Sequence, residues 1–119
     1  MNVRSHRDLL VWQKAMDLVA NCYLLTRRFP DVERFGLTSQ LRRAIVSVPA
    51  NIAERRGRGM TGAYLNHLSI AAGSLAEVDT HLGVAQRLGY ISHDQLTEIT
   101  VQLEEVGRML TGLRIALEK

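Results

Sequence analysis

Apolar residues recur along most of this 119-residue chain at alternating steps of four and three, which is the spacing of one face of an α-helix. The segment at 61–88 carries the pattern without interruption, at Tyr64, Leu68, Ala71, Leu75, Val78, Leu82 and Ala85. No segment alternates apolar and polar residues in the way that predicts a half-buried strand. The spacing therefore predicts an all-α protein.

Four stretches share this spacing. We expect helices at about residues 8–29, 38–57, 61–88 and 93–117. Asp8 is a good N-cap for the first helix, Gly89 a stop for the third, and Ser92 opens a capping box for the fourth. The core positions predicted on the other three helices are Val11, Ala15, Leu18, Cys22, Leu25 and Phe29; Leu41, Ile45, Val48 and Ile52; and Leu96, Ile99, Leu103, Val106, Leu110, Leu113 and Leu117. Helices of this length with short connections favour an up-down-up-down four-helix bundle, a single domain of residues 1–119.

Pro49 lies inside the second predicted helix, where it removes one backbone hydrogen bond and crowds the carbonyl four residues earlier. We therefore expect a kink or a break near Ile45 to Val48. The helix is expected to end at Gly57 or Gly59.

Two features exceed what a lone bundle needs. The first helix carries a second apolar flank of Trp12, Met16, Val19 and Tyr23, and the third has a patch of small residues from Ala71 to Ser74 where another backbone could approach. A closed ring of copies would bury both features.

The composition limits the class of protein. Apolar residues make up 46% of the chain and charged residues 23%, which is typical of a globular protein. Cys22 is the only cysteine, so we expect it to pack as a small hydrophobe in a reduced cytoplasm. No uncharged apolar run approaches the ~20 residues that span a bilayer. These features predict a soluble cytoplasmic protein.

Few residues carry the patterns of catalysis or metal binding. Glu77 and His81 are four apart on one helical face and could supply two metal ligands, but no second such pair accompanies them. An interaction between a surface carboxylate and an imidazole is the favoured interpretation. The sequence has no Gly-rich phosphate loop after a strand, no nucleophile elbow and no zinc spacing. We therefore expect no metal, no cofactor and no enzymatic activity.

Positive charge is concentrated on the second predicted helix. Between Arg42 and Arg58 five arginines stand against one glutamate, a local charge of +4 in a chain whose net charge is +3. These arginines are Arg42, Arg43, Arg55, Arg56 and Arg58. Asn51 and Ser47 share the polar side of this helix, where they could add hydrogen bonds to a ligand or satisfy backbone groups freed by Pro49.

Two explanations of the arginines stay open. Cations at a helix C-terminus interact favourably with the macrodipole by about 0.3–1 kcal/mol, and Arg42 or Arg43 could pair with acids on a neighbouring helix. One or two cations would be sufficient for the dipole, however, and three beside Gly57 and Gly59 form a compact corner suited to phosphate. No aromatic residue interleaves with these arginines, so the pattern favours phosphate contacts over base stacking.

Several motifs resemble one known family. They are V-W-Q-K-A-M-D-L at 11–18, F-G-L-T-S-Q-L-R-R-A at 35–44, S-V-P-A-N-I-A-E at 47–54, A-G-S-L-A-E at 72–77 and R-L-G-Y at 87–90. In this order they are similar to the four-helix-bundle proteins encoded in intervening sequences of bacterial 23S ribosomal RNA genes. The resemblance covers nearly the whole chain.

The resemblance implies a homopentameric barrel, related to the accessory variability proteins of diversity-generating retroelements. Those relatives have a basic surface and are thought to bind nucleic acid and a reverse transcriptase, and no enzymatic activity is attached to the family. The family usually has glycine after the N-I-A-E motif, whereas this chain has Arg55, which adds positive charge.

Two hypotheses of function follow. The first is a non-enzymatic, homo-oligomeric protein that binds RNA or DNA with low sequence preference. Its phosphate contacts would come from Arg42, Arg43, Arg55, Arg56 and Arg58, with Asn51 beside them. The second is a scaffold for another protein, such as a reverse transcriptase, in which the arginines form ion pairs between subunits.

Overall fold

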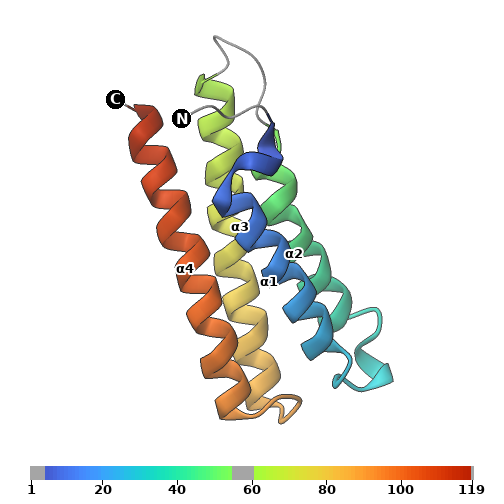
Figure 1. The fold of residues 1–119 in the computed structure, drawn as a ribbon. Coiled ribbons are helices and arrows are strands. Elements are labelled where there is room, and N and C mark those ends of the chain that lie inside the picture. Colours follow the sequence, from blue (N-terminus) through green and yellow to red (C-terminus); the bar gives the residue numbers. More distant parts are fainter. Residues whose placement is uncertain (1–4, 55–60, 119) are drawn as a thin grey trace.

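The computed structural model describes residues 5–54 and 61–118, and in these ranges the chain forms four α-helices, two short 3-10 turns and no strand (Figure 1). The helices are α1 (Leu10–Thr26), α2 (Leu37–Ile52), α3 (Thr61–Arg87) and α4 (His93–Glu118), and the 3-10 turns are η1 (His6–Asp8) and η2 (Asp31–Glu33). The all-α prediction is confirmed.

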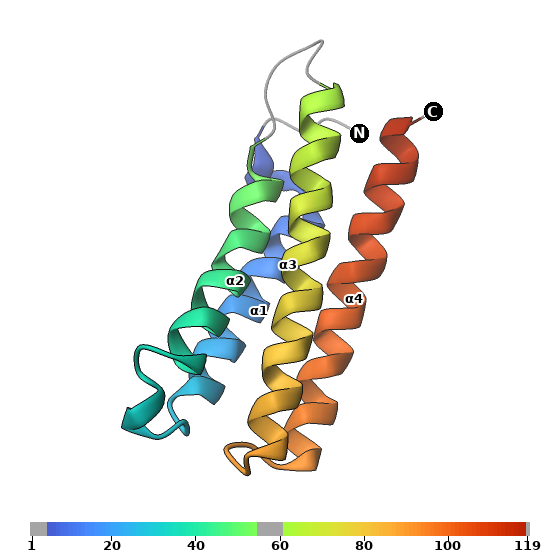
Figure 2. The same cartoon turned by 180° about the vertical axis from the view of Figure 1, so that it is seen from behind.

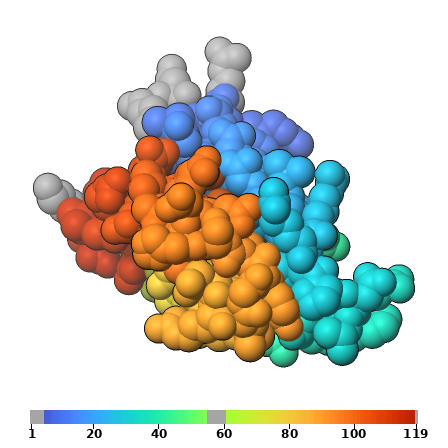
Figure 3. Space-filling model, turned by 90° about the horizontal axis from the view of Figure 1, so that it is seen from below, coloured from blue at the N-terminus to red at the C-terminus, as the bar shows by residue number. Residues whose placement is uncertain are grey.

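Successive helices run in opposite directions, and each packs against its neighbours in chain order (Figures 1 and 2). The contact between α2 and α3 is the most extensive, and α1 also packs against α4, which closes the ring of four. Seen from the end opposite the chain termini, the α1–α2 connection projects to one side of the bundle (Figure 3). None of the helices in the described ranges combines the length and the apolarity that a membrane span requires.

The core lies where the four-three spacing predicts. Every predicted core position on α2 and α3 is buried, as are Val11, Ala15, Leu18 and Cys22 on α1. On α4 the four central positions are buried, and Leu96, Leu113 and Leu117 near its ends are half-buried against the core. Burying a Val, Leu or Ile side chain contributes about 1.5–3 kcal/mol, so this face supplies most of the driving force for folding.

The helix ends at the α3–α4 turn follow the predicted signals. Gly89 has a φ of +79°, and the amide of Tyr90 donates to the Ala85 carbonyl at 2.9 Å, the Schellman arrangement that ends a helix. The Ser92 amide donates to Gln95 Oε1 at 2.8 Å, and the Gln95 amide donates to Ser92 Oγ at 3.0 Å. The predicted capping box is therefore present.

Helix α1 is shorter than the spacing suggests. Asp8 does not cap it, because its carboxylate accepts the Ser5 amide at 3.2 Å and closes a capping box on η1. Helix α1 begins at Leu10 without a side-chain cap. After Thr26 the chain tightens into bonds between residues three apart, including Phe29 N–H to the Thr26 carbonyl at 3.0 Å.

Helix α2 corrects the expectation drawn from Pro49. The helix runs unbroken through Ile45 to Val48, so a break there is wrong, while the alternative of a kink stays a prediction. It ends at Ile52, with Ala53 as its C-cap, rather than at a glycine further on. Pro49 is buried in the last turn, where the missing N–H affects only one of the final backbone bonds. Arg55, Arg56 and Arg58 lie outside the described residues.

Candidate nucleic-acid interface

Arg42 and Arg43 lie on the outward side of α2, because Leu41, Ala44 and Ile45 turn the opposite side into the core. Arg42 is half-buried: its Nε donates to Thr26 Oγ1 at 2.9 Å, and its guanidinium carbon lies 4.6 Å from the centre of the Tyr23 ring. These two contacts tie α2 to the end of α1 and hold the guanidinium in one place.

The charge of both arginines stays available. Within the described residues, the terminal nitrogens of Arg42 donate to no protein atom, and Arg43 is exposed with neither a hydrogen bond nor an ion pair. The alternative in which Arg42 or Arg43 pairs with an acid of a neighbouring helix is therefore not met among the residues that the structure describes. Each guanidinium keeps the forked donors that match phosphate oxygens.

A groove of about 640 Å³ opens beside them between α1, the η2–α2 connection and α2. We call it the α1–α2 groove. Its lining residues are Tyr23, Arg34, Phe35, Thr38, Ser39, Arg42, Arg43, Val46 and Ser47. The lining contains three arginines and no carboxylate, which makes its potential positive.

Sequence reasoning missed part of this groove. Arg34 and Phe35 belong to the connection before α2, and Tyr23 belongs to α1. The observation that no aromatic residue interleaves with the arginines holds along the linear sequence. The tertiary structure nevertheless brings two aromatic rings to the same arginines.

Asn51 has a different environment from the arginines. Its side-chain amide donates to the Ser47 carbonyl at 2.8 Å and to Ser47 Oγ at 3.0 Å. Its Oδ1 lies 2.9 Å from Nδ1 of His67 on α3, which is the donor because the oxygen can only accept. Ser47 Oγ also lies 3.0 Å from Ser74 Oγ on α3. These half-buried residues form a polar α2–α3 network.

Two roles were considered for Asn51: to hydrogen-bond a ligand, or to satisfy a backbone group freed by Pro49. Its amide bonds a backbone carbonyl, but that carbonyl belongs to Ser47, whereas the N–H missing at Pro49 would have met the carbonyl of Ile45. A role in binding nucleic acid stays a prediction. It would require Asn51 to give up bonds to α2 or α3.

The Glu77–His81 pair is present as expected. Glu77 Oε2 and His81 Nε2 are 3.4 Å apart, but they are not aligned as a hydrogen bond, and Nε2 is buried. No group of three or more potential metal ligands occurs among the residues that the structure describes.

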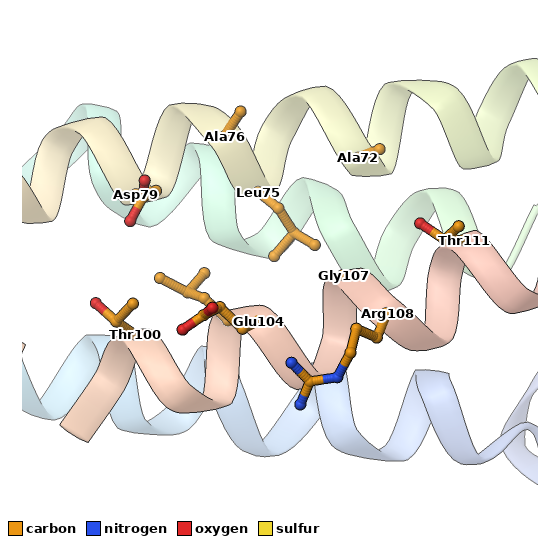
Figure 4. Close-up of a pocket in the computed structure, with 10 residues that line it drawn as sticks. Ala72, Leu75, Ala76, Asp79, Thr100, Glu104, Gly107, Arg108 and Thr111 are labelled. Atoms are coloured by element: carbon orange, nitrogen blue, oxygen red, sulfur yellow. The ribbon is translucent and has the colours of Figure 1, made fainter. Parts of the chain in front are cut away.

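A second groove, of about 700 Å³, lies between α3 and α4 (Figure 4). In this α3–α4 groove, Leu75 extends from α3 toward α4, and small residues such as Ala72, Ala76 and Gly107 line the sides. Its charged residues are Asp79, Glu104 and Arg108. With two carboxylates against one guanidinium, it lacks the positive potential of the α1–α2 groove.

Comparison with known proteins identifies the family of this chain. No curated protein matches it. The family model described as 23S rRNA-intervening sequence protein matches residues 7–112, which include all of α1, α2 and α3 and most of α4. Since this match spans most of the chain and the structure is a set of four helices, the protein belongs to the 23S rRNA-intervening sequence protein family.

Proposed function

We propose that this protein binds RNA or DNA through phosphate contacts from the arginine face of α2 and catalyses no reaction. The observation that carries the proposal is the α1–α2 groove, whose lining holds three arginines and no carboxylate. Arg43 has no hydrogen bond or ion pair in the described part of the chain, so its guanidinium is available to a ligand that brings negative charge.

The arginines contribute differently. Arg43 offers its whole guanidinium, whereas Arg42 offers its terminal nitrogens while its Nε stays bound to Thr26. Arg34 joins them because it lines the same groove. Arg55, Arg56 and Arg58 remain part of the proposal on their charge alone. Phosphate contacts carry no sequence information, so we expect low sequence preference.

Assembly into a homopentamer is part of the same proposal and rests on the family resemblance. The packing within one chain accounts for much of the second apolar flank of α1, because Trp12, Val19 and Tyr23 pack against the core. Ala71, from the patch of small residues on α3, is also buried. Met16, which is 43% exposed, remains for contacts between copies. Repeated arginine faces on a ring would add their weak phosphate contacts through multivalency.

A scaffold for another protein, such as a reverse transcriptase, is the second candidate. The exposed apolar side chains of Val32 and Phe35, 85% and 88% exposed, favour a covered surface near the α1–α2 connection. On this alternative the arginines would form ion pairs between subunits, and nucleic acid would not bind.

The test is fluorescence anisotropy of a labelled RNA stem-loop and the DNA stem-loop of the same sequence, titrated with protein across a salt series. The variant Arg43→Gln is compared with Arg108→Gln, which removes the same charge from exposed α4 on the far side of the ring of helices. We expect affinity to fall steeply with salt. Arg43→Gln should lower the slope by roughly one for each subunit that contacts the strand, because each of these subunits neutralises one phosphate fewer. Arg108→Gln should bind as the wild type does.

Absence of binding to both stem-loops would refute the proposal and favour the scaffold. Equal effects of the two substitutions would also count against it, because the positive charge would then act without a particular site. Sedimentation of every variant checks that the assembly is intact.

A further inference from the structure

We infer that the α1–α2 groove takes an unpaired nucleobase, stacked on the exposed ring of Phe35, so that the preferred ligand is single-stranded RNA or DNA. This inference rests on the nucleic-acid binding proposed above and deepens it. Phe35 is 88% exposed and lines the same groove as Arg42 and Arg43. Stacking of a base on such a ring contributes about 1–3 kcal/mol.

The turn that presents Phe35 is held in place by Glu33. One oxygen of its carboxylate accepts the Leu37 amide at 3.1 Å at the start of α2, and the other accepts the Tyr90 hydroxyl at 2.9 Å. The amides of Glu33 and Gly36 also donate within the turn, to the carbonyls of Pro30 and Glu33, both at 2.9 Å. The backbone is therefore fixed on both sides of Phe35, whose side chain projects into solvent from this turn.

The surroundings of the ring match the parts of a nucleotide. The Arg34 guanidinium carbon lies 5.4 Å from the centre of the Phe35 ring, a cation–π arrangement that polarises it. Arg42 and Arg43 line the same groove and supply donors for phosphate. A flat group and an anion are thus accommodated together, in a volume of about 640 Å³ that fits the range of small-ligand sites.

These features favour a single strand over a duplex. In a duplex the bases stack on one another, so their faces cannot meet a protein ring, and only base edges, sugars and phosphates are in reach. Contacts to phosphate alone need no exposed aromatic side chain. A second copy of the chain could cover Phe35 instead, but it would have to bring carboxylates to three arginines.

The experiment measures the anisotropy of a labelled oligothymidylate of about 20 nucleotides, longer than the ~4–16 nucleotides that single-strand sites cover. A strand with the same phosphates and abasic sugars is measured beside it. Phe35→Leu keeps apolar bulk without the ring, Phe35→Trp keeps a stacking surface, and Val32→Ala changes an equally exposed side chain that does not line the groove. We expect the wild type to prefer the base-bearing strand by roughly 5- to 150-fold. Phe35→Leu should abolish the preference and leave the abasic affinity and the salt slope unchanged, while Phe35→Trp and Val32→Ala keep it.

The outcomes separate this inference from the proposed function. If the wild type binds both strands equally while Arg43→Gln weakens both, stacking is wrong and phosphate binding stands. If the wild type binds no strand, the proposed function fails, and this inference fails with it. A Phe35→Leu protein that keeps the base preference but changes its sedimenting mass would assign the ring to a contact between copies and overturn the inference.

Discussion

Arg42 illustrates how one side chain can serve both the fold and a ligand. Its Nε bonds Thr26 and its guanidinium stacks on Tyr23, so its position is fixed before any ligand arrives. Arg43, one residue later, has no such contact among the described residues. A substitution of Arg42 should therefore affect the stability of the fold, whereas a substitution of Arg43 should not.

Arg42→Lys should lower the free energy of unfolding by about 1 kcal/mol, because lysine keeps the charge but cannot make the Nε bond or the planar stack. Arg43→Lys should change it by less than about 0.5 kcal/mol, since an exposed side chain without protein partners is replaced by a similar one. Urea unfolding of both variants provides the comparison. Equal stabilities would mean that the Arg42 contacts contribute nothing to the fold.

Cys22 should make stability depend on pH above neutrality. Burial raises the pKa of Cys22 from 9.0 to about 12. A raised folded-state pKa gives stability that is present below pH 9 and is lost as the pH rises toward 12, because the unfolded chain ionises first. Between about pH 8 and pH 10 the wild type should lose on the order of 1 kcal/mol from this thiol.

The measurement is urea unfolding at several pH values for the wild type and Cys22→Ala, with the pH dependence compared rather than the absolute stability. The variant should be nearly flat from about pH 8 to about pH 10. At higher pH Tyr90 adds to the decline, because the hydrogen bond to Glu33 raises the pKa of its hydroxyl. The same slope in both proteins would exclude Cys22 as its source.

At the level of elements, the α1–α2 connection and the α3–α4 turn hold each other. The Tyr90 hydroxyl donates to Glu33, and the rings of Tyr90 and Phe29 lie 5.5 Å apart. The position of Tyr90 depends in turn on Gly89, whose positive φ ends α3 and redirects the chain. One turn thereby supports the segment that presents Phe35.

Gly89→Ala should lower stability by about 1–2 kcal/mol, because an L residue is strained at a φ of +79°. Gly112→Ala is the matched control. It lies inside α4, where an added Cβ would meet nothing within 4 Å, and it should raise stability by about 0.5–1 kcal/mol through helix propensity. Thermal or urea unfolding distinguishes the two signs. A neutral Gly89→Ala would contradict the role assigned to the turn.

The polar α2–α3 network makes a further prediction at this scale. Asn51→Ala should lower stability by about 1–3 kcal/mol, because it removes the partner of the half-buried His67 Nδ1 and two side-chain bonds to Ser47. At temperatures where the variant is folded, its affinity for the RNA stem-loop should equal that of the wild type. Loss of affinity with unchanged stability would instead make Asn51 a ligand-binding residue.

On the scale of the molecule, two grooves among the described residues differ in charge. The α1–α2 groove carries three arginines without a carboxylate, and the α3–α4 groove carries two carboxylates with one arginine. A polyanion would therefore favour the first surface and avoid the second. The net charge of +3 alone does not reveal this division.

The sequence by itself determined the helices, most of the core and the signals at the α3–α4 turn. These depend on contacts within one or two helical turns, such as the Ser92–Gln95 capping box, and on the helical period. It also indicated Arg42 and Arg43, because charge density can be read along the chain. The break expected from Pro49 is wrong because a proline in the last turn of a helix affects only one of the final backbone bonds, and the sequence did not place the end of α2 at Ile52.

Only the tertiary structure decided which side chains meet. The bond between Asn51 and His67 joins residues 16 apart, and that between Glu33 and Tyr90 joins residues 57 apart. Phe35 and Tyr23 reach the arginines of α2 because packing brings three segments together. The physical reason is that periodicity specifies which face of a helix is buried, whereas the partner across the interface depends on how the helices pack.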